Sequence, residues 1–152
     1  MAESTATGQS WHAQGRPLLD GAASGAAIVL DEPLSFWGGL DAASGTIIDQ
    51  RHPQRGQNVA GRLVVMPAGR GSSSSSSVLA EAIRAGRGPL GILMAEPDDV
   101  VVLGALVVQL LDGLTCPIVL LPPAELRRIR SGDRVQLSAG GGLVIEPARA
   151  LT

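Results

Sequence analysis

The sequence predicts an α/β domain with a mixed β-sheet, and three features of the chain lead to this fold class. Between residues 61 and 121, short apolar segments alternate with segments of helical period, which is typical of parallel strands joined by crossover helices. Near the end of the chain, two segments of alternating polarity flank the glycines of residues 140–142 and predict an antiparallel hairpin. A length of 152 residues with 45% hydrophobic residues favours one domain with a buried core.

The first half of the chain is predicted to contribute a tail and three strands. Residues 1–14 are polar and lack the apolar stretch of a signal peptide, so we expect a flexible tail followed by a folded domain over residues 15–152. Short apolar runs predict strands at 26–30, 46–49 and 61–67. The segments between these strands, DEPLSFWGGLDAASG and QRHPQRGQNVA, are expected to be loops, because glycine, proline and polar residues interrupt any regular pattern.

The second half is predicted to alternate helices with strands. The apolar residues of VLAEAIR recur at helical spacing, and glycines end that helix. A strand at 89–94, a helix from Val100 to Leu111 that Asp98 or Asp99 could cap, and a strand at 116–121 follow. PPAELRRIR is expected to be a short helix with proline at its start, and SGDRVQLSAGGGLVIEP a closing hairpin. The predicted order is therefore β-β-β-α-β-α-β-α-β-β.

The composition excludes several classes of function. All twelve basic residues are arginine, and a net charge of −2 gives no indication of a nucleic-acid or anionic-membrane surface. Cys116, His12 and His52 are too few to hold an iron–sulfur cluster or a structural zinc ion, so no metal site is expected in this chain alone. One cysteine allows no internal disulfide, and a cytoplasmic location is expected. The longest apolar run, Val100–Leu111, is too short to span a bilayer.

Six serines, Ser72–Ser77, stand in a row within MPAGRGSSSSSSVLAEAIRAGRG. One interpretation is a flexible serine-rich linker. The position between a predicted strand and an amphipathic helix favours instead a loop that ends at a helix N-terminus, where free backbone N–H groups and the helix dipole attract anions. Gly69 and Gly71 would let the backbone turn tightly beside a ligand. We therefore expect the serine run to belong to a working site.

Several short motifs follow one another in a consistent order between residue 31 and residue 136. They are SFWGGLD, GxIID, HPxxG, AGRxxVxPxGRGS and IRSGD. Together they resemble the small subunit, or swivel domain, of the aconitase X family. That family's fold is a swivelling β/β/α domain, which agrees with a mixed sheet, crossover helices and an antiparallel hairpin.

The resemblance implies a set of site residues. Aconitases carry the motif GSSRE, whose first serine is the catalytic base, and that serine matches Ser72 while the second matches Ser73. Serines replace the arginine and glutamate that follow, so the carboxylate-binding role of that arginine is not transferred. Ser75 has no counterpart in the motif, and its replacement by alanine is expected to be nearly silent. Beside Ser72 as the base, the residues expected to contact substrate are Gly38, Gly39, His52, Arg70, Gly71 and Ser73.

Two of these segments also have structural interpretations. SFWGGLD either plugs the core with its aromatic residues or forms a wall that faces the substrate and the large subunit, with Gly38 and Gly39 allowing close approach. His52 is either a solvated loop histidine or part of the site. Arg70 is the cation nearest to the serines and is a candidate for holding a substrate carboxylate.

The resemblance further implies a hydro-lyase made of two subunits. A large aconitase X subunit would carry an iron or iron–sulfur centre, and this chain would bind none by itself. The expected substrate is a small hydroxy acid, cis-3-hydroxy-L-proline, dehydrated toward Δ1-pyrroline-2-carboxylate. Phosphomevalonate is the alternative substrate. A non-catalytic module that binds an anion or a partner protein remains a further alternative.

Overall fold

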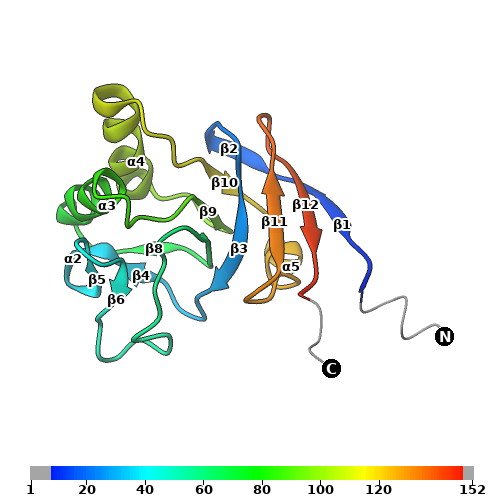
Figure 1. Cartoon of the computed structure of the whole chain (residues 1–152), viewed down its shortest axis with the longest axis horizontal. Helices are drawn as coiled ribbons and strands as arrows, with labels where there is room; N and C mark the ends of the chain where they lie inside the picture. The colour runs from blue at the N-terminus through cyan, green and yellow to red at the C-terminus, as the bar shows by residue number, and fades with distance from the viewer. Residues whose placement is uncertain (1–7, 149–152) are drawn as a thin grey trace.

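The computed structural model describes residues 8–148, and an eight-stranded mixed sheet forms its centre (Figure 1). The strands lie in the order β1 (Trp11–Gln14), β12 (Gly142–Glu146), β11 (Arg134–Leu137), β3 (Ala23–Val29), β7 (Leu63–Met66), β9 (Gly91–Met94), β10 (Ile118–Leu120) and β2 (Arg16–Leu19). The four strands β3, β7, β9 and β10 are parallel, and the others pair antiparallel. The predicted α/β class with crossover helices and a closing hairpin is confirmed.

Two helices cover one face of the parallel strands, and the antiparallel strands fold over the other face (Figure 1). The helices are α3 (Ser74–Arg84) and α4 (Asp99–Asp112), while the short α5 (Pro123–Leu126) lies on the opposite side. Alternate residues of β7 therefore enter different cores: Val64 packs in the helix-side core, and Val65 packs between the two layers of strands. Burial on both faces explains why this strand is an unbroken apolar run.

Helix α4 begins and ends as its sequence predicts. The Asp98 side chain accepts hydrogen bonds from the N–H groups of Val100 and Val101 at 2.9 and 3.0 Å, and Gly113 ends the helix with a left-handed φ of 69°. The outward face of α4 stays apolar, with Leu110 and Leu111 both 72% exposed. Among residues 8–148, no helix has both the length and the apolarity that a membrane crossing requires.

The predicted tail and the predicted strand at 46–49 need correction. Residues 11–14 form β1, which pairs with β12, so four residues assigned to the tail belong to the sheet. Residues 1–7 lie outside the described part of the chain. β6 (Thr46–Ile47) is shorter than predicted and pairs only with β5 (Leu40–Asp41), apart from the main sheet. β2 was also missed.

The sheet nearly closes on itself where β1 continues into β2. These strands lie at opposite ends of the strand order yet are joined by Gly15 alone. The Gly15 N–H group donates a hydrogen bond of 2.8 Å to the carbonyl of Gly141. A Cβ atom on Gly15 would overlap the side chain of Val119, so only glycine fits at this crossing without displacement of β10.

Candidate functional site

The serine run forms the start of helix α3, which contradicts the linker interpretation. Ser72 and Ser73 are exposed and lie just before the helix, which begins at Ser74. The carbonyl of Ser72 accepts a hydrogen bond of 2.9 Å from the N–H group of Ser75, so the turn is already formed at Ser72. The first turn of α3 contains no acidic residue. This end of the helix therefore keeps the positive potential of its dipole and its first N–H groups.

The loop that leads to the serines leaves the sheet at the carboxyl end of β7. After Pro67 it forms the two-residue strand β8 (Gly69–Arg70), and Gly71 follows with a φ of +112°. A Cβ atom on Gly69 would overlap the Asp98 carboxylate that caps α4. In both open and closed parallel α/β sheets, ligands commonly bind at the carboxyl ends of the strands, and this loop places Ser72 at that edge.

The structure brings together the two segments that the motifs singled out. β8 pairs in parallel with β4 (Leu34–Ser35), so that Ser35 lies opposite Arg70. The irregular turn α2 (Phe36–Gly39) then lies against the start of α3 (Figure 1). Ser75 is 2% exposed, and its Oγ accepts a hydrogen bond of 3.2 Å from the N–H group of Trp37.

The SFWGGLD segment is divided between the core and the surface. Phe36 is completely buried in the helix-side core, whereas the next residue, Trp37, is 61% exposed. Gly38 has a left-handed φ of +77° and is exposed, which makes this turn possible. Gly39 is buried against Leu34. Gly38 therefore lies at the surface, beside the loop of residues 69–73 that carries Ser72, which we call the serine loop. Gly39 instead packs inside the turn.

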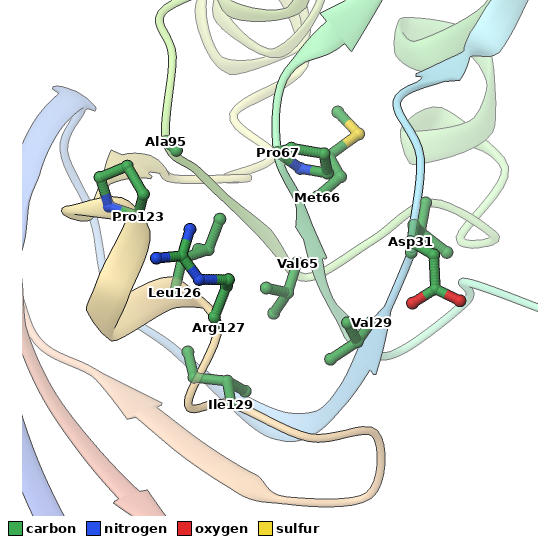
Figure 2. A pocket seen from close by; sticks show the side chains of 11 residues that line it. Val29, Asp31, Val65, Met66, Pro67, Ala95, Pro123, Leu126, Arg127 and Ile129 are labelled. Atoms are coloured by element: carbon green, nitrogen blue, oxygen red, sulfur yellow. The ribbon is translucent and has the colours of Figure 1, made fainter.

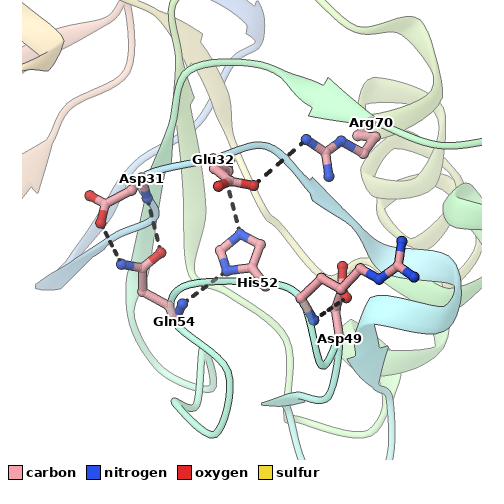
Figure 3. Close-up of polar contacts among 7 residues, drawn as sticks. Asp31, Glu32, Asp49, His52, Gln54 and Arg70 are labelled. Atoms are coloured by element: carbon pink, nitrogen blue, oxygen red, sulfur yellow. Dashed lines mark hydrogen bonds and ion pairs between the residues drawn. The ribbon is translucent and has the colours of Figure 1, made fainter.

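His52 is buried and engaged by backbone groups rather than solvated (Figure 3). Its Nδ1 accepts a hydrogen bond of 3.1 Å from the N–H group of Gln54, so its Nε2 carries the proton and donates to the carbonyl of Glu32 at 3.1 Å. Gln54 in turn bonds both the backbone and the carboxylate of Asp31. Both ring nitrogens are thus occupied, and the histidine holds the segment after β3 in place.

Arg70 lies beside the segment after β3 that His52 holds in place. Its guanidinium is 4.0 Å from the carboxylate of Glu32, and both side chains are 51% exposed (Figure 3). Such a long and exposed ion pair contributes little, so an anionic ligand can compete for the arginine. Glu32, Ser35 and Ser75 were not among the predicted site residues, because their contacts join segments that are distant in the sequence.

A cleft of about 420 Å³ opens at the same carboxyl edge, between the parallel strands and α5. Figure 2 shows Val65, Leu126 and Ile129 around this space, with Arg127 directly after α5. Its walls are mainly apolar, and Asp31 and Arg127 are the charged residues that line it. The cleft offers no hydroxyl or thiol nucleophile, so the candidate for chemistry is the neighbouring serine loop.

The described residues do not fit an iron site. No group of three or more His, Cys, Asp or Glu side chains among residues 8–148 is arranged to hold a metal ion. The single thiol belongs to Cys116, which is completely buried, and burial raises its pKa to about 12. A thiol that stays protonated is not a metal ligand.

Comparison with known proteins agrees with this arrangement. A family model described as the aconitase X swivel domain matches residues 12–145. A cis-3-hydroxy-L-proline dehydratase of Pseudomonas aeruginosa is 47% identical over 106 residues, which make up 70% of this chain and 18% of that protein. A phosphomevalonate dehydratase small subunit of Thermococcus onnurineus is 33% identical over 133 residues, covering 86% of this chain and 95% of that subunit. The crystal structure of Thermococcus kodakaraensis aconitase X in its holo-form gives a TM-score of 0.78 at 30% identity and covers 89% of this chain and 98% of that chain.

The chain belongs to the aconitase X family and corresponds to its swivel domain. It spans about a fifth of the length of the cis-3-hydroxy-L-proline dehydratases that it matches, at 18% and 22%. It spans nearly the whole length of the phosphomevalonate dehydratase small subunit, at 95%. The family match begins inside β1, in agreement with the place of this strand in the sheet.

Proposed function

We propose that this chain is the small, swivel subunit of a hydro-lyase that dehydrates cis-3-hydroxy-L-proline toward Δ1-pyrroline-2-carboxylate. The observation that carries the substrate is the 47% identity to a cis-3-hydroxy-L-proline dehydratase over 70% of this chain. A separate large subunit is proposed because relatives of similar length are named small subunits. We place the resulting heterodimer in the cytoplasm.

The proposed reaction removes water from the substrate across two neighbouring carbons. A base takes the proton from the carbon that bears the carboxylate, the bond to the hydroxyl on the next carbon breaks, and the hydroxyl leaves as water after gaining a proton. The resulting enamine takes up a proton on carbon, and its nitrogen loses a proton to give the cyclic imine. An iron or iron–sulfur centre in the large subunit would supply Lewis acidity for the departing hydroxyl.

In this mechanism Ser72 is the base. A serine hydroxyl is not deprotonated at neutral pH in water, so its surroundings must favour the alkoxide. Ser72 lies at the N-terminus of α3, whose first turn has no carboxylate, and Arg70 is two residues away. The helix dipole, nearby N–H groups and the exclusion of water by the large subunit together stabilise negative charge there.

The other site residues bind the substrate or shape the loop. Arg70 exchanges its weak contact with Glu32 for the substrate carboxylate, which an arginine can bind through two parallel hydrogen bonds. Ser73 and the backbone at Gly71 and Gly38 line the same surface. His52 acts indirectly, because both of its ring nitrogens hold backbone groups.

Phosphomevalonate dehydration is the second candidate function. It is favoured by the match in length, since this chain covers 95% of a phosphomevalonate dehydratase small subunit. The two functions differ in the ligand charge that the large subunit and the serine loop must accommodate. The N–H groups and the dipole at the N-terminus of α3 would attract a phosphate even more strongly than a carboxylate.

The test is reconstitution of the complex from this chain and its large subunit. Each substrate is supplied separately, and imine formation from cis-3-hydroxy-L-proline is measured beside water loss from phosphomevalonate. Turnover of the hydroxyproline supports the proposal, and turnover of phosphomevalonate alone supports the second candidate. A metal-loaded complex that turns over neither substrate contradicts both and favours a module that only binds anions.

A further inference from the structure

Two serine hydroxyls hold both backbone polar groups of Trp37. The Trp37 N–H group donates to Ser75 Oγ at 3.2 Å, and Ser35 Oγ donates to the Trp37 carbonyl at 3.0 Å. The two hydroxyls are 3.3 Å apart. Because the Ser35 proton already points at the carbonyl, the Ser75 hydroxyl must donate to Ser35 Oγ. The result is a closed ring of three hydrogen bonds, which we call the serine clamp.

The serine clamp also supports the backbone directly before Ser72. Gly71 packs its Cα against both hydroxyls: a Cβ atom there would overlap Ser35 Oγ and would lie 2.7 Å from Ser75 Oγ. The pairing of β4 with β8 fixes the same two segments one residue earlier, where Ser35 lies opposite Arg70. The hydroxyls of the buried Ser75 and the partly buried Ser35 therefore set the position of the turn at Trp37 relative to the loop that carries Ser72.

We propose that Ser35 and Ser75 are positioning residues of the dehydratase, which fix Ser72 and Trp37 relative to each other. This inference rests on the proposed function, because it assigns Ser72 the part of the base. Ser75 is 2% exposed, whereas Trp37 is 61% exposed, so Ser75 lies beneath the turn that presents Trp37, and the partly buried Ser35 lies at its edge. Neither hydroxyl contacts the substrate. Their effect is to keep the loops in one arrangement, since small displacements of a reacting group lower the rate steeply.

The experiment compares Ser75→Ala and Ser35→Ala with the double variant and with Ser77→Ala. Ser77 lies exposed in the same first turns of α3 and outside the clamp, so its variant is the matched control. In the full chain, hydrogen exchange at the Trp37 amide should accelerate about tenfold or more in Ser75→Ala and stay unchanged in Ser77→Ala. In the reconstituted complex, each clamp variant should lower kcat by about tenfold to a hundredfold with little change in KM.

The remaining comparisons decide the inference. The double variant should be hardly worse than either single variant, because the three hydrogen bonds act as one unit. Unchanged Trp37 exchange in both single variants, or a loss that lies in KM alone, overturns the clamp. An inactive wild-type complex overturns the proposed function instead, and the exchange measurement then still decides whether the clamp fixes the two loops. Thermal unfolding of each variant well above the assay temperature separates mispositioning from loss of the fold.

Discussion

Ser72 and Ser75 have the same side chain and lie three residues apart, yet the fold gives them opposite environments. Ser72 is exposed just before α3, at the carboxyl edge of the sheet. Ser75 is buried beneath the Trp37 turn. Residues three positions apart would share one face of a helix, so the contrast arises because Ser72 lies before α3 begins, whereas Ser75 lies within its first turn, on the side that packs under Trp37. Because Ser75 is buried and hydrogen-bonded, its replacement by alanine is not expected to be silent. The exposed Ser77 is therefore the better control.

Replacing Ser72 by alanine is expected to lower kcat of the reconstituted enzyme by about 10²–10⁴-fold, the scale of a positioned acid–base group. KM should change little, because the hydroxyl acts mainly in the transition state. Stability should be nearly unchanged, since Ser72 is exposed and lies outside the helix. Steady-state kinetics beside Ser77→Ala provide the measurement. A kcat close to that of the wild type in the Ser72 variant would show that Ser72 is not the base.

Cys116 should resist thiol reagents in the native protein. Burial raises its pKa from 9.0 to about 12, so its thiolate is about a thousandfold rarer below pH 9 than in the unfolded chain. Reaction with an aromatic disulfide reagent at pH 8 should therefore be at least that much slower for native than for denatured protein. Equal rates would show that the thiol is accessible.

The same shift makes a prediction about the pH dependence of unfolding. A folded-state pKa above the unfolded one contributes stability that is fully present below pH 9 and is lost as the pH rises toward about 12. Cys116→Ala should remove this part of the alkaline decline, although the cavity that it leaves lowers stability at every pH. Denaturant unfolding at several pH values measures both effects.

At the scale of elements, the closure of the sheet depends on the crossing at Gly15. An alanine there would drive its Cβ atom into Val119 of β10, so Gly15→Ala is expected to lower the free energy of unfolding by about 1–3 kcal/mol. Gly142→Ala is the matched control: it lies in β12, and its added Cβ atom would meet only the Gln14 side chain at 3.9 Å. Chemical denaturation of both variants makes the comparison. Equal stability of the two would mean that β10 adapts freely to the extra atom.

Elements also explain the position of the serine loop. Gly69 packs against the Asp98 carboxylate, and that carboxylate caps α4. The start of α4 and the loop before α3 are thereby fixed together at one edge of the parallel strands. Because both helices begin at this edge, their positive ends face the same side of the molecule.

For the whole molecule, we expect the isolated chain to be catalytically silent. The described residues bring no three His, Cys, Asp or Glu side chains together as a metal site, so the proposed iron centre would have to be held by the large subunit. Adding that subunit should produce dehydratase activity and bring bound iron, which metal analysis of the purified complex detects. Dehydratase turnover by this chain alone, after metal stripping, would contradict the assignment.

Formation of the complex has a separate readout in the exposed Trp37. In a Trp11→Phe background, Trp37 is the sole tryptophan, and its emission should change when the large subunit covers the serine loop. Exposed aromatic residues are frequent anchors at the centres of interfaces. An unchanged emission in an active complex would place Trp37 outside the contact.

The sequence by itself determined the central strands, the two long helices with the Asp98 cap, the closing hairpin and the glycine–serine loop. Each of these follows from residues that are close in the chain, because helical and strand periods, caps and turns depend on neighbours a few positions away. The resemblance to the aconitase X family could also be seen in the sequence, because its motifs are short local segments in a fixed order. The main alternation of strands and helices could therefore be predicted before any contact was known.

Only the tertiary structure decided which strands close the sheet and which polar residues meet beside the loop that carries Ser72. β1 pairs with a strand about 130 residues further along the chain, and nothing near Trp11 indicates that partner. The burial of His52 beside Glu32 and the ring of Ser35, Ser75 and Trp37 likewise arise between segments that meet only after folding. A hydroxyl or an imidazole has the same chemistry in every loop, and its role depends on what the rest of the chain places around it.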